Sequence, residues 1–402
     1  MRGAARAARA VLMAATGTET GTGTGHKRPH PEPAARIGTH DGTFHCDEAL
    51  ACFLLRLLPR YRDAEIVRTR DPQRLAGCDV VVDVGGEYDP GRHRYDHHQR
   101  SFTESMRSLR PDKPWSTKLS SAGLVYCHFG SQILAGLLGQ PEDGPVVTAL
   151  YDKLYENFVE EIDAIDNGIA PAAGEPRYAL STTLSARVGL LNPRWNEPDQ
   201  DTEVGTAPGT PAGFRRAMEL VGSEFLERLD FYHRAWLPAR ALVEAAIRQR
   251  FEVMPGQPGA AWSSGGELGC GEAKSPRVSP PQVDGSGQVL ELSQGGCPWK
   301  EHLFQLEREL ALPRPLQLVL FPDRGGQWRV QSVPAAPHSF QSRLPLPEAW
   351  RGLRDEALSE LAGIPGCVFV HASGFIGGHR TREGALEMAR RTLELGGSTE
   401  SA

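Results

Sequence analysis

The chain has 402 residues, enough for two domains of about 100–200 residues each. The chain has 44 Lys and Arg and 50 Asp and Glu, which gives a formal net charge of -6. This charge excludes attraction of nucleic acid by an overall positive charge of the protein. The seven cysteines form no C-x-x-C pair, which argues against a disulfide framework and favours a reducing compartment. No run approaches the roughly 18 consecutive apolar residues of a membrane span, so we expect no membrane association.

Residues 1–35 have the composition of a targeting or disordered segment. Arg2, Arg6 and Arg9 stand among alanines, with no acidic residue before Glu19, as in mitochondrial transit peptides. The Thr/Gly repeat at 16–25 predicts an unfolded stretch, so a disordered tail is the alternative reading. Ordered sequence is expected from about residue 36.

Three polar clusters of metal-ligand type lie within residues 38–99. In chain order they are His40-x4-His45-x-Asp47-Glu48, then Asp83, then Asp96-His97-His98. Imidazole and carboxylate ligands together suit Mn, Zn or Fe better than Ca or Mg, which prefer oxygen alone. A cap or a surface position explains any one of these residues, but the whole set predicts a metal-dependent hydrolase.

Helix and strand patterns alternate around these clusters. The apolar pattern predicts a buried helix over 47–58 and strands over 65–68 and 80–84. This alternation predicts an α/β domain with a mainly parallel sheet, with Asp83 at the carboxyl end of a strand. Ligands of open α/β sheets bind at those ends, so we expect the metal site there.

The middle of the chain is predicted to be mostly helical. The expected helices are 119–138, 145–165, 178–188 and a long connecting helix over 214–250. Asp163 and Asp166 share one helix face because they are three residues apart. Segments 202–213 and 254–287 are rich in Gly, Pro and Ser and are expected to be flexible.

The last third predicts a smaller α/β domain. Expected strands are 289–292, 316–321, 328–333 and 368–371, and expected helices are 348–361 and 381–395. Gly377-Gly378-His379-Arg380 precedes the last helix, where backbone N–H groups can meet a phosphate. Arg343, beside an aromatic residue in Ser339-Phe-Gln-Ser-Arg-Leu-Pro345, is suited to base stacking and phosphate pairing. A structural turn and a solvated loop are the alternatives for these two segments.

The motif residues resemble a known family. Asp96-His97-His98 after Val82-Asp83, with His40, His45 and Asp47 before them, resembles the DHH phosphoesterase superfamily. Longer stretches over 38–48, 83–90, 95–102 and 369–380 are similar to the melanocyte proliferating gene exonuclease family. The likeness covers about 36–396. The insertions at 202–213 and 254–287 depart from the family pattern.

The resemblance implies a two-lobed, DHH phosphoesterase-like α/β fold that binds a divalent metal, as two Mn2+ or Mg2+ ions. The implied parts are a metal-binding catalytic domain over 36–200, a connecting region over 201–253, an insertion over 254–287 and a substrate-binding α/β domain over 288–396. The implied metal ligands are His40, His45, Asp47, Asp83, Asp96, His97 and Asp163, with Asp166 as the alternative to Asp163.

The resemblance also assigns roles. Asp83 would bridge both ions, and His98 would polarise the scissile phosphate. Substrate would meet Gly377, Gly378, His379 and Arg380, and Arg343 is the further substrate contact predicted from its aromatic neighbour. The implied activity is 3'-to-5' exonuclease action on single-stranded 3' ends of RNA, in the mitochondrial matrix and the nucleus.

Two other functions stay open. A small-molecule phosphoesterase would hydrolyse short oligonucleotides, cyclic dinucleotides or pyrophosphate. A non-catalytic metal protein would bind RNA or partners without turnover. The second is disfavoured because every motif keeps a plausible ligand.

Overall fold

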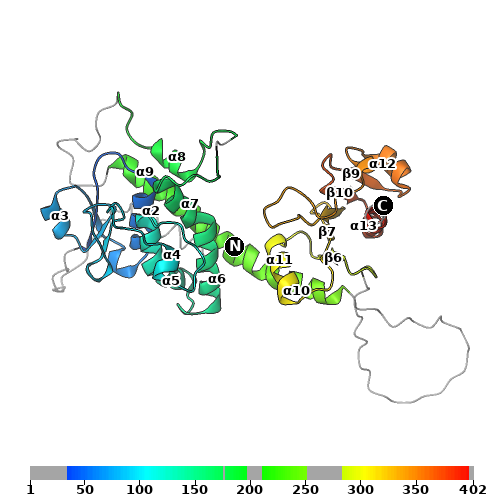
Figure 1. Ribbon diagram of the computed structural model, residues 1–402, viewed down its shortest axis with the longest axis horizontal. Helices are drawn as coiled ribbons and strands as arrows, with labels where there is room; N and C mark the ends of the chain where they lie inside the picture. Colours follow the sequence, from blue (N-terminus) through cyan, green and yellow to red (C-terminus); the bar gives the residue numbers. More distant parts are fainter. Residues whose placement is uncertain (1–33, 175–176, 197–210, 251–282, 398–402) are drawn as a thin grey trace, which may run out of the picture. The chain divides into compact units, whose positions relative to one another are not determined.

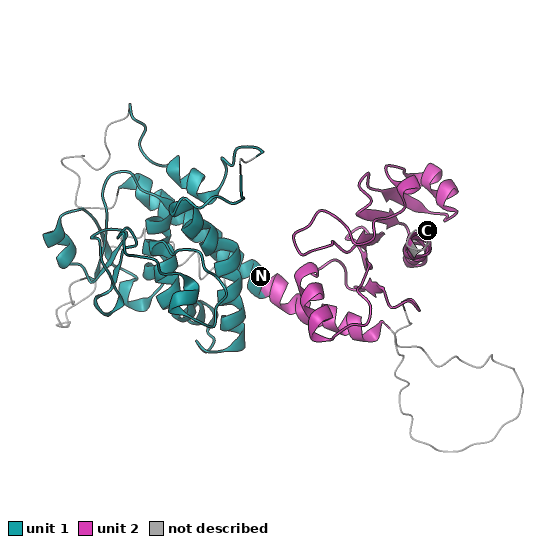
Figure 2. Cartoon of the chain, viewed as in Figure 1, with its two compact units in different colours: residues 1–233 teal, residues 234–402 magenta. Residues whose placement is uncertain are grey.

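The structure, a computed structural model, describes residues 34–174, 177–196, 211–250 and 283–397 (Figure 1). The chain divides into two compact units, Met1–His233 and Arg234–Ala402, coloured teal and magenta in Figure 2. This division falls within the connecting region expected over 201–253. Nearly all of the predicted targeting segment 1–35 and most of the insertion 254–287 lie outside the described residues.

Unit 1 is built on a five-stranded sheet of order β2-β1-β3-β5-β4. Its strands are β1 (Arg36–Thr39), β2 (Glu65–Arg68), β3 (Val80–Val82), β4 (Tyr88–Asp89) and β5 (Arg94–Tyr95). Only the edge pairing of β4 with β5 is antiparallel among the strand pairs of this sheet, which confirms the predicted mainly parallel α/β sheet. The central strand β3 is a run of three buried valines, the pattern of a strand covered on both faces.

Helices make up much of the rest of unit 1. They are α2 (Cys46–Arg56), α3 (Pro72–Ala76), α4 (Met106–Leu109), α5 (Ser121–Leu138), α6 (Pro145–Leu154), α7 (Glu160–Asp166), α8 (Leu184–Gly189) and α9 (Ala212–Phe231). Helices α2 and α5 contact strands β3 and β5, respectively. Helix α2 is buried over most of its length and packs against α5 and α9. A Cβ on Gly222 of α9 would lie 2.2 Å from the Phe53 ring, so glycine permits this close packing.

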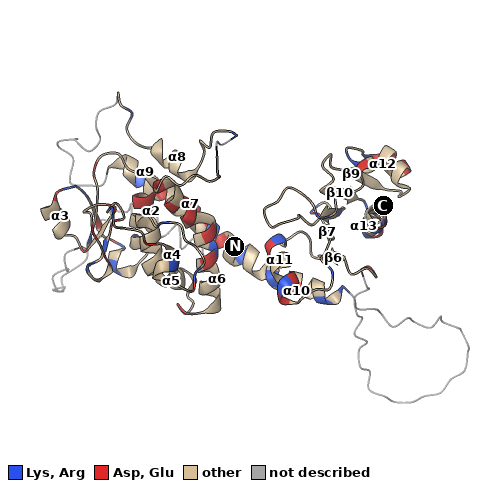
Figure 3. Ribbon diagram, in the orientation of Figure 1, with Lys and Arg blue, Asp and Glu red and all other residues tan. Residues whose placement is uncertain are grey.

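The predicted helix over 145–165 contains an irregular turn. A π-helical segment, η3 (Tyr155–Val159), joins α6 to α7. Such segments are often found at functional sites. Helix α7 is rich in acidic residues (Figure 3) and carries both Asp163 and Asp166.

Helix α5 is a core helix. By length and composition it could cross a membrane, but 56% of it is buried inside the structure. It packs against α2, α6 and α7.

Unit 2 is the smaller α/β unit. Its sheet has the order β6-β7-β8-β10-β9, with β6 (Val289–Glu291), β7 (Leu318–Pro322), β8 (Trp328–Ser332), β9 (Cys367–Val370) and β10 (Ile376–His379). Strand β6 pairs in parallel with β7, and the remaining pairs are antiparallel. Its main helices are α10 (Leu237–Gln249), α11 (Lys300–Glu309), α12 (Asp355–Ala362) and α13 (Arg382–Gly397).

Two hydrophobic clusters form the core of unit 2. One includes Leu320 and Val330 of the sheet with Leu358 of α12 and Met388 of α13. The other joins Val319 of the sheet to residues of α10 and α11. The sheet is therefore packed by helices on both sides, as the fold class predicted for this region requires.

Three elements differ from the sequence predictions. The long helix over 214–250 is interrupted by a π-helical segment, η5 (Tyr232–Trp236), just before Pro238, which cannot donate a helical hydrogen bond. Helix α8 is shorter than the predicted 178–188, because Thr183 caps it by accepting a hydrogen bond from the N–H of Ala186. Strand β10 includes Gly377, Gly378 and His379, which were expected to precede the last helix as a phosphate-binding segment or, alternatively, to form a structural turn.

Candidate metal centre

Polar side chains meet where the parallel strands of unit 1 end. His40 follows β1, Asp83 follows β3, and Asp96-His97-His98 follow β5. Helix α2 begins beside them, and α7 ends at Asp166. The carboxyl edge of the sheet therefore gathers the predicted motifs, as expected for a ligand site in an open α/β sheet.

Three overlapping groups of side chains could each hold a metal ion. Within each group the potential ligand atoms all lie within 4.8 Å of one another. The groups are His40, His45, Glu48 and Asp83; Asp83, His97 and His98; and Asp47, His97 and Asp166. Asp83 belongs to the first two groups and His97 to the last two, so the groups form one continuous cluster.

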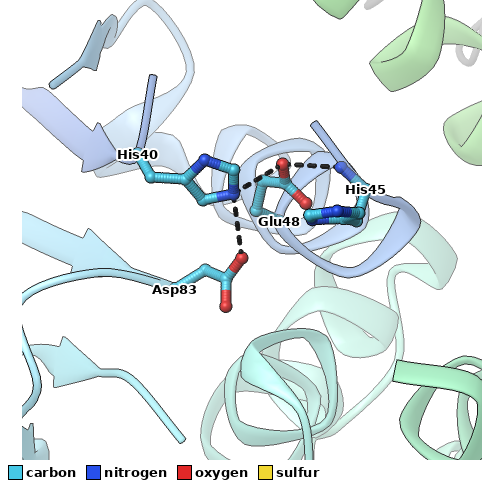
Figure 4. A group of neighbouring side chains, drawn as sticks. All are labelled: His40, His45, Glu48 and Asp83. Atoms are coloured by element: carbon cyan, nitrogen blue, oxygen red, sulfur yellow. Dashed lines mark hydrogen bonds and ion pairs between the residues drawn. The ribbon is translucent and has the colours of Figure 1, made fainter. Parts of the chain in front are cut away.

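Glu48 and Asp83 face the same nitrogen of His40 (Figure 4). The Nε2 atom of His40 lies 3.1 Å from Glu48 Oε1 and 3.3 Å from Asp83 Oδ2. Its other ring nitrogen, Nδ1, lies 2.9 Å from the carbonyl oxygen of Asp41 and is assigned as the donor. Such a bond fixes the tautomer and leaves Nε2 free to ligate a metal. Glu48 also accepts a 2.8 Å hydrogen bond from the backbone N–H of His45.

His97 lies among three carboxylates. Its Nε2 atom is 3.3 Å from Asp83 Oδ1, 3.0 Å from Asp166 Oδ2 and 3.9 Å from Asp47 Oδ2. The side chains of His97, Asp47 and Asp83 are at most 4% exposed. This part of the cluster is therefore shielded from bulk water.

Asp83 has an unusual backbone conformation. Its φ of 59° lies in the left-handed region, which Asp tolerates better than most residues. Gly85 and Gly86, with φ of 101° and 69°, complete the sharp turn after β3. Non-glycine residues in this region cost about 1–3 kcal/mol and concentrate at functional sites. Here the turn brings the Asp83 carboxylate between His40 and His97.

The cluster contains carboxylate oxygens that the protein leaves unsatisfied. Both oxygens of Asp47 and the Oε2 atom of Glu48 are buried and have no hydrogen-bond partner among the described residues. Buried charges are normally paired or bound to metal ions. The donor set of His nitrogen and carboxylate oxygen thus fits divalent ions such as Mn2+.

The pKa directions reflect this crowding of acidic groups. Burial lowers the pKa of His40, but Asp83 and Glu48 outweigh it and raise the value to about 10. Burial and the nearby Asp83 raise the pKa of Asp47 well above its usual value. Burial opposes ionisation of Asp83, yet His40 and His97 hold its pKa below the ordinary range. Without metal, protons on the histidines supply the positive charge that the carboxylates require.

Asp96 lies beside the cluster but outside the three groups. Its oxygens accept hydrogen bonds from the Gly86 N–H at 2.6 Å and from His98 Nδ1 at 2.7 Å. The structure therefore makes Asp96, predicted as a ligand, an orienting partner of His98. The His98 side chain is 61% exposed and can meet a substrate.

The two aspartates of α7, Asp163 and Asp166, have different surroundings. Asp166 reaches His97, whereas Asp163 is fully buried and its oxygens accept hydrogen bonds from Ser120 and Tyr155. Burial raises the pKa of Asp163 to about 7 against the opposing effect of the Ser120 hydrogen bonds. The preference for Asp163 over Asp166 as a candidate ligand is corrected accordingly.

One residue of the cluster was absent from the predicted ligands. Asp166 was predicted as the alternative to Asp163, whereas Glu48 was quoted in the first motif without a ligand role. The signal for Glu48 was its position three residues after His45, the capping-box spacing that turns an acidic side chain back toward a helix start.

The cluster lines a pocket of about 770 Å³. This volume lies in the usual range of about 300–1,000 Å³ for small-ligand sites. Ile162 and Ile165 of α7 contribute an apolar wall, and Arg70 contributes a cation. The Arg70 guanidinium is 65% exposed and lies 3.3 Å from Asp41.

In unit 2 the predicted glycine motif is a packed strand. Gly377 and Gly378 pair with β8 and β9 within the sheet, so they do not form a helix N-terminus. A Cβ on Gly378 would lie 2.3 Å from the Arg329 guanidinium. His379 is buried, with Nε2 2.9 Å from the Pro365 carbonyl oxygen. These three residues have structural roles, whereas the next residue, Arg380, is exposed.

Arg343 is engaged within unit 2. Its two terminal nitrogens donate to the Glu307 carboxylate at 2.7 and 2.8 Å, and one also donates to the Leu316 carbonyl at 2.9 Å. Its guanidinium lies 4.6 Å from the Phe304 ring centroid. The aromatic ring beside Arg343 is thus Phe304 and not the expected Phe340, which is exposed. The ion pair with Glu307 corrects the prediction that this guanidinium is available to substrate.

The chain is similar to one group of proteins over most of its length. The family described as Uncharacterised protein family (UPF0160) matches residues 36–258 and 275–393. The MYG1 exonuclease of Homo sapiens is 66% identical over 359 residues, covering 89% of this chain and 85% of the human protein. The MYG1 proteins of Caenorhabditis elegans and Saccharomyces cerevisiae are 46% and 40% identical, covering 90% and 89% of this chain and 95% of each relative. The unmatched residues between the two family segments lie within the predicted insertion 254–287.

Proposed function

Since the chain belongs to the MYG1 family (UPF0160), as its motifs predict, we propose that it is a metal-dependent 3'-to-5' exonuclease acting on single-stranded RNA. The proposed cofactors are two divalent ions, Mn2+ or Mg2+, held by the cluster at the carboxyl edge of the unit 1 sheet. Relatives carry the name exonuclease, which supports the reaction class. The substrate and polarity rest on the family resemblance.

The single observation that carries the proposal is the buried, unsatisfied carboxylate of Asp47 in a cluster that shares Asp83 and His97. His40, His45, Glu48 and Asp83 would hold one ion. Asp47, His97 and Asp166, with Asp83 nearby, would hold the other. When bound, two such ions neutralise phosphodiester charge and lower the pKa of water to near neutrality.

The surrounding residues bind and orient the substrate. His98 lines the pocket, and its Nδ1 donates to Asp96, which raises the pKa of the ring. The protonated ring can then donate from its other nitrogen to a phosphate oxygen. Arg70 lines the same pocket and can pair with a second phosphate. Ile162 and Ile165 offer an apolar surface for a base.

The proposed locations are the mitochondrial matrix and the nucleus. The support is the arginine-rich, acid-free start of the chain, which suits a transit peptide. The absence of a C-x-x-C pair is compatible with both reducing compartments.

The test is a time course on 5'-labelled single-stranded RNA and DNA with Mn2+, Mg2+ or EDTA. We expect a metal-dependent RNA ladder that shortens from the 3' end. Asp83→Asn should lower the rate by at least about 100-fold, beyond the 10–100-fold typical of outer-shell changes. Asn suits this test because it tolerates the left-handed backbone at residue 83.

Asp89→Asn is the matched control, because that carboxylate caps its own turn through the Gly91 N–H at 2.9 Å. It should cleave at the wild-type rate. Full activity of Asp83→Asn would overturn the assignment. Activity that vanishes as RNA length rises would indicate a small-molecule phosphoesterase, and bound metal without turnover would indicate the binding protein.

A further inference from the structure

Asp163 is a buried carboxylate beside the metal cluster whose oxygens are both occupied. Oδ1 accepts hydrogen bonds from the backbone N–H of Ser120 at 3.0 Å and from its hydroxyl at 2.8 Å. Oδ2 accepts a hydrogen bond from the Tyr155 hydroxyl at 3.0 Å. These bonds use the carboxylate to join α7 to the start of α5.

The residue after Ser120 continues this connection into the cluster. The hydroxyl of Ser121, the first residue of α5, donates to Asp83 Oδ1 at 3.3 Å, and both side chains are buried. Asp163 and Asp83 are thus held by adjacent serines at one helix N-terminus. Any shift of the α5 start relative to α7 would move the donor that orients Asp83.

The same joint positions Asp166. It lies one helical turn after Asp163 on α7, and its Oδ2 atom is 3.0 Å from His97 Nε2. Asn167 strengthens the joint by donating from Nδ2 to the carbonyls of Lys118 at 3.0 Å and Asp163 at 2.9 Å. The attachment of α7 to the segment before α5 therefore sets where Asp166 meets His97.

Close contact of the two helices requires a glycine. A Cβ on Gly123 of α5 would lie 2.3 Å from Asp163 Oδ1 and 2.4 Å from Oδ2. Asp163 therefore occupies the space that any other residue at position 123 would fill. The geometry of the joint depends on both residues.

We infer that Asp163 is a positioning residue for metal binding: by joining α7 to the serines of α5, it sets the distance between Asp83 and Asp166 across His97. The inference rests on the proposed metal-dependent function. It assigns Asp163 an effect on ion affinity through Asp83 and Asp166, without direct ligation. Outer-shell partners of metal ligands typically contribute about 10–100-fold to metal affinity.

The test is calorimetric titration of the full chain with Mn2+, together with the nuclease time course. Asp163→Asn should bind as many ions as the wild type but about 10–100-fold more weakly, and excess Mn2+ should restore its cleavage. Ser121→Ala and Gly123→Ala should weaken binding in the same direction. Asp166→Asn, which alters a proposed ligand, should lose an ion.

Ser332→Ala is the matched control for Ser121→Ala, since Ser332 is a buried serine of unit 2. It should bind Mn2+ as the wild type does. If Asp163→Asn fails to fold in thermal unfolding, Ser121→Ala and Gly123→Ala decide the question by their Mn2+ affinity.

Two results would overturn the inference while the proposed function stands. One is wild-type Mn2+ affinity in the folded Asp163 or Ser121 variants, and the other is loss of a bound ion in Asp163→Asn. A wild-type chain that binds no Mn2+ and cleaves nothing would overturn both proposals together.

Discussion

Two histidines with nearly equal burial, His97 in unit 1 and His379 in unit 2, have opposite surroundings. They are 3% and 2% exposed. His379 has a complete set of backbone partners: Nε2 faces the Pro365 carbonyl at 2.9 Å, and Nδ1 accepts from the Thr381 N–H at 3.0 Å. His97 instead faces three carboxylates, and no backbone group of the described residues forms a hydrogen bond with its ring.

The difference teaches that burial of a polar residue does not by itself indicate function. Both motifs were predicted to be functional, and both histidines lie inside the protein. In unit 2 the two predicted polar residues have partners within the unit: backbone groups for His379 and the Glu307 carboxylate for Arg343. In unit 1, carboxylate oxygens of Asp47 and Glu48 have no hydrogen-bond partner within the described part of the chain, and these free acceptors mark the candidate site.

The largest expected effect comes from exchanging each histidine for glutamine. His97→Gln should lower the cleavage rate by at least about 100-fold, because it removes a proposed metal ligand. The protein should still fold. His379→Gln should lower the free energy of unfolding by about 1–3 kcal/mol, because it leaves buried backbone groups unpaired. Urea unfolding and the nuclease time course, run on both variants, measure the two effects.

The activity of His379→Gln per folded molecule should match the wild type at a temperature where it stays folded. A selective loss of RNA binding in that variant, with stability unchanged, would contradict the comparison and restore the predicted substrate role of the glycine motif.

A smaller effect, on the stability of the metal-free protein, is expected when Asp47 is replaced. Asp47→Asn should raise the free energy of unfolding of the metal-free protein by roughly 0.5–2 kcal/mol, the gain common for a single stabilising substitution. The reason is that its buried carboxylate has no hydrogen-bond partner among the described residues and only a long, 3.9 Å approach from His97. The same variant should lose Mn2+ binding. Denaturant unfolding in EDTA measures the first effect and calorimetry the second.

Asp152→Asn is the matched control, because that carboxylate accepts a 2.7 Å bond from Lys113. It should be neutral or destabilising. A destabilised Asp47→Asn protein in EDTA would mean that Asp47 has a structural partner after all.

The smallest effect concerns pH. In the metal-free protein, the neighbouring Asp166 and Asp83 outweigh burial and raise the pKa of His97 from 6.5 to about 9. A raised histidine pKa contributes stability that is fully present below about pH 6.5 and is lost as pH rises through about 9. Unfolding curves in EDTA from pH 6 to 10 should therefore converge for wild type and His97→Gln toward high pH. A difference in free energy of unfolding between the two proteins that grows with pH would contradict this prediction.

Much of the fold could be predicted because its core elements have clear periodic patterns. The run Glu65–Arg68 was assigned with the bounds that the structure has. Strands β4 and β5 were missed because two-residue strands carry no alternation. The strand β10 was missed because its sequence, Ile-Gly-Gly-His, has the composition of a turn.

The site was predictable at the level of motifs but not of single atoms. Motif spacing identified His40, Asp83 and His97, which the structure brings together. Spacing could not separate Asp163 from Asp166, since both share a helix face and only burial against Ser120 distinguishes them. Nor could it reveal that Glu307, distant in sequence, pairs with Arg343.

The left-handed backbone at Asp83 also limits how this protein can change by mutation. Asn and Gly are the replacements that this conformation accepts most readily, and neither carries a charge. A lineage that drifts at this position would therefore tend to keep an intact fold after its chemistry is gone. Folded, inactive descendants are the expected outcome of such drift, and the residue at this one position would identify them.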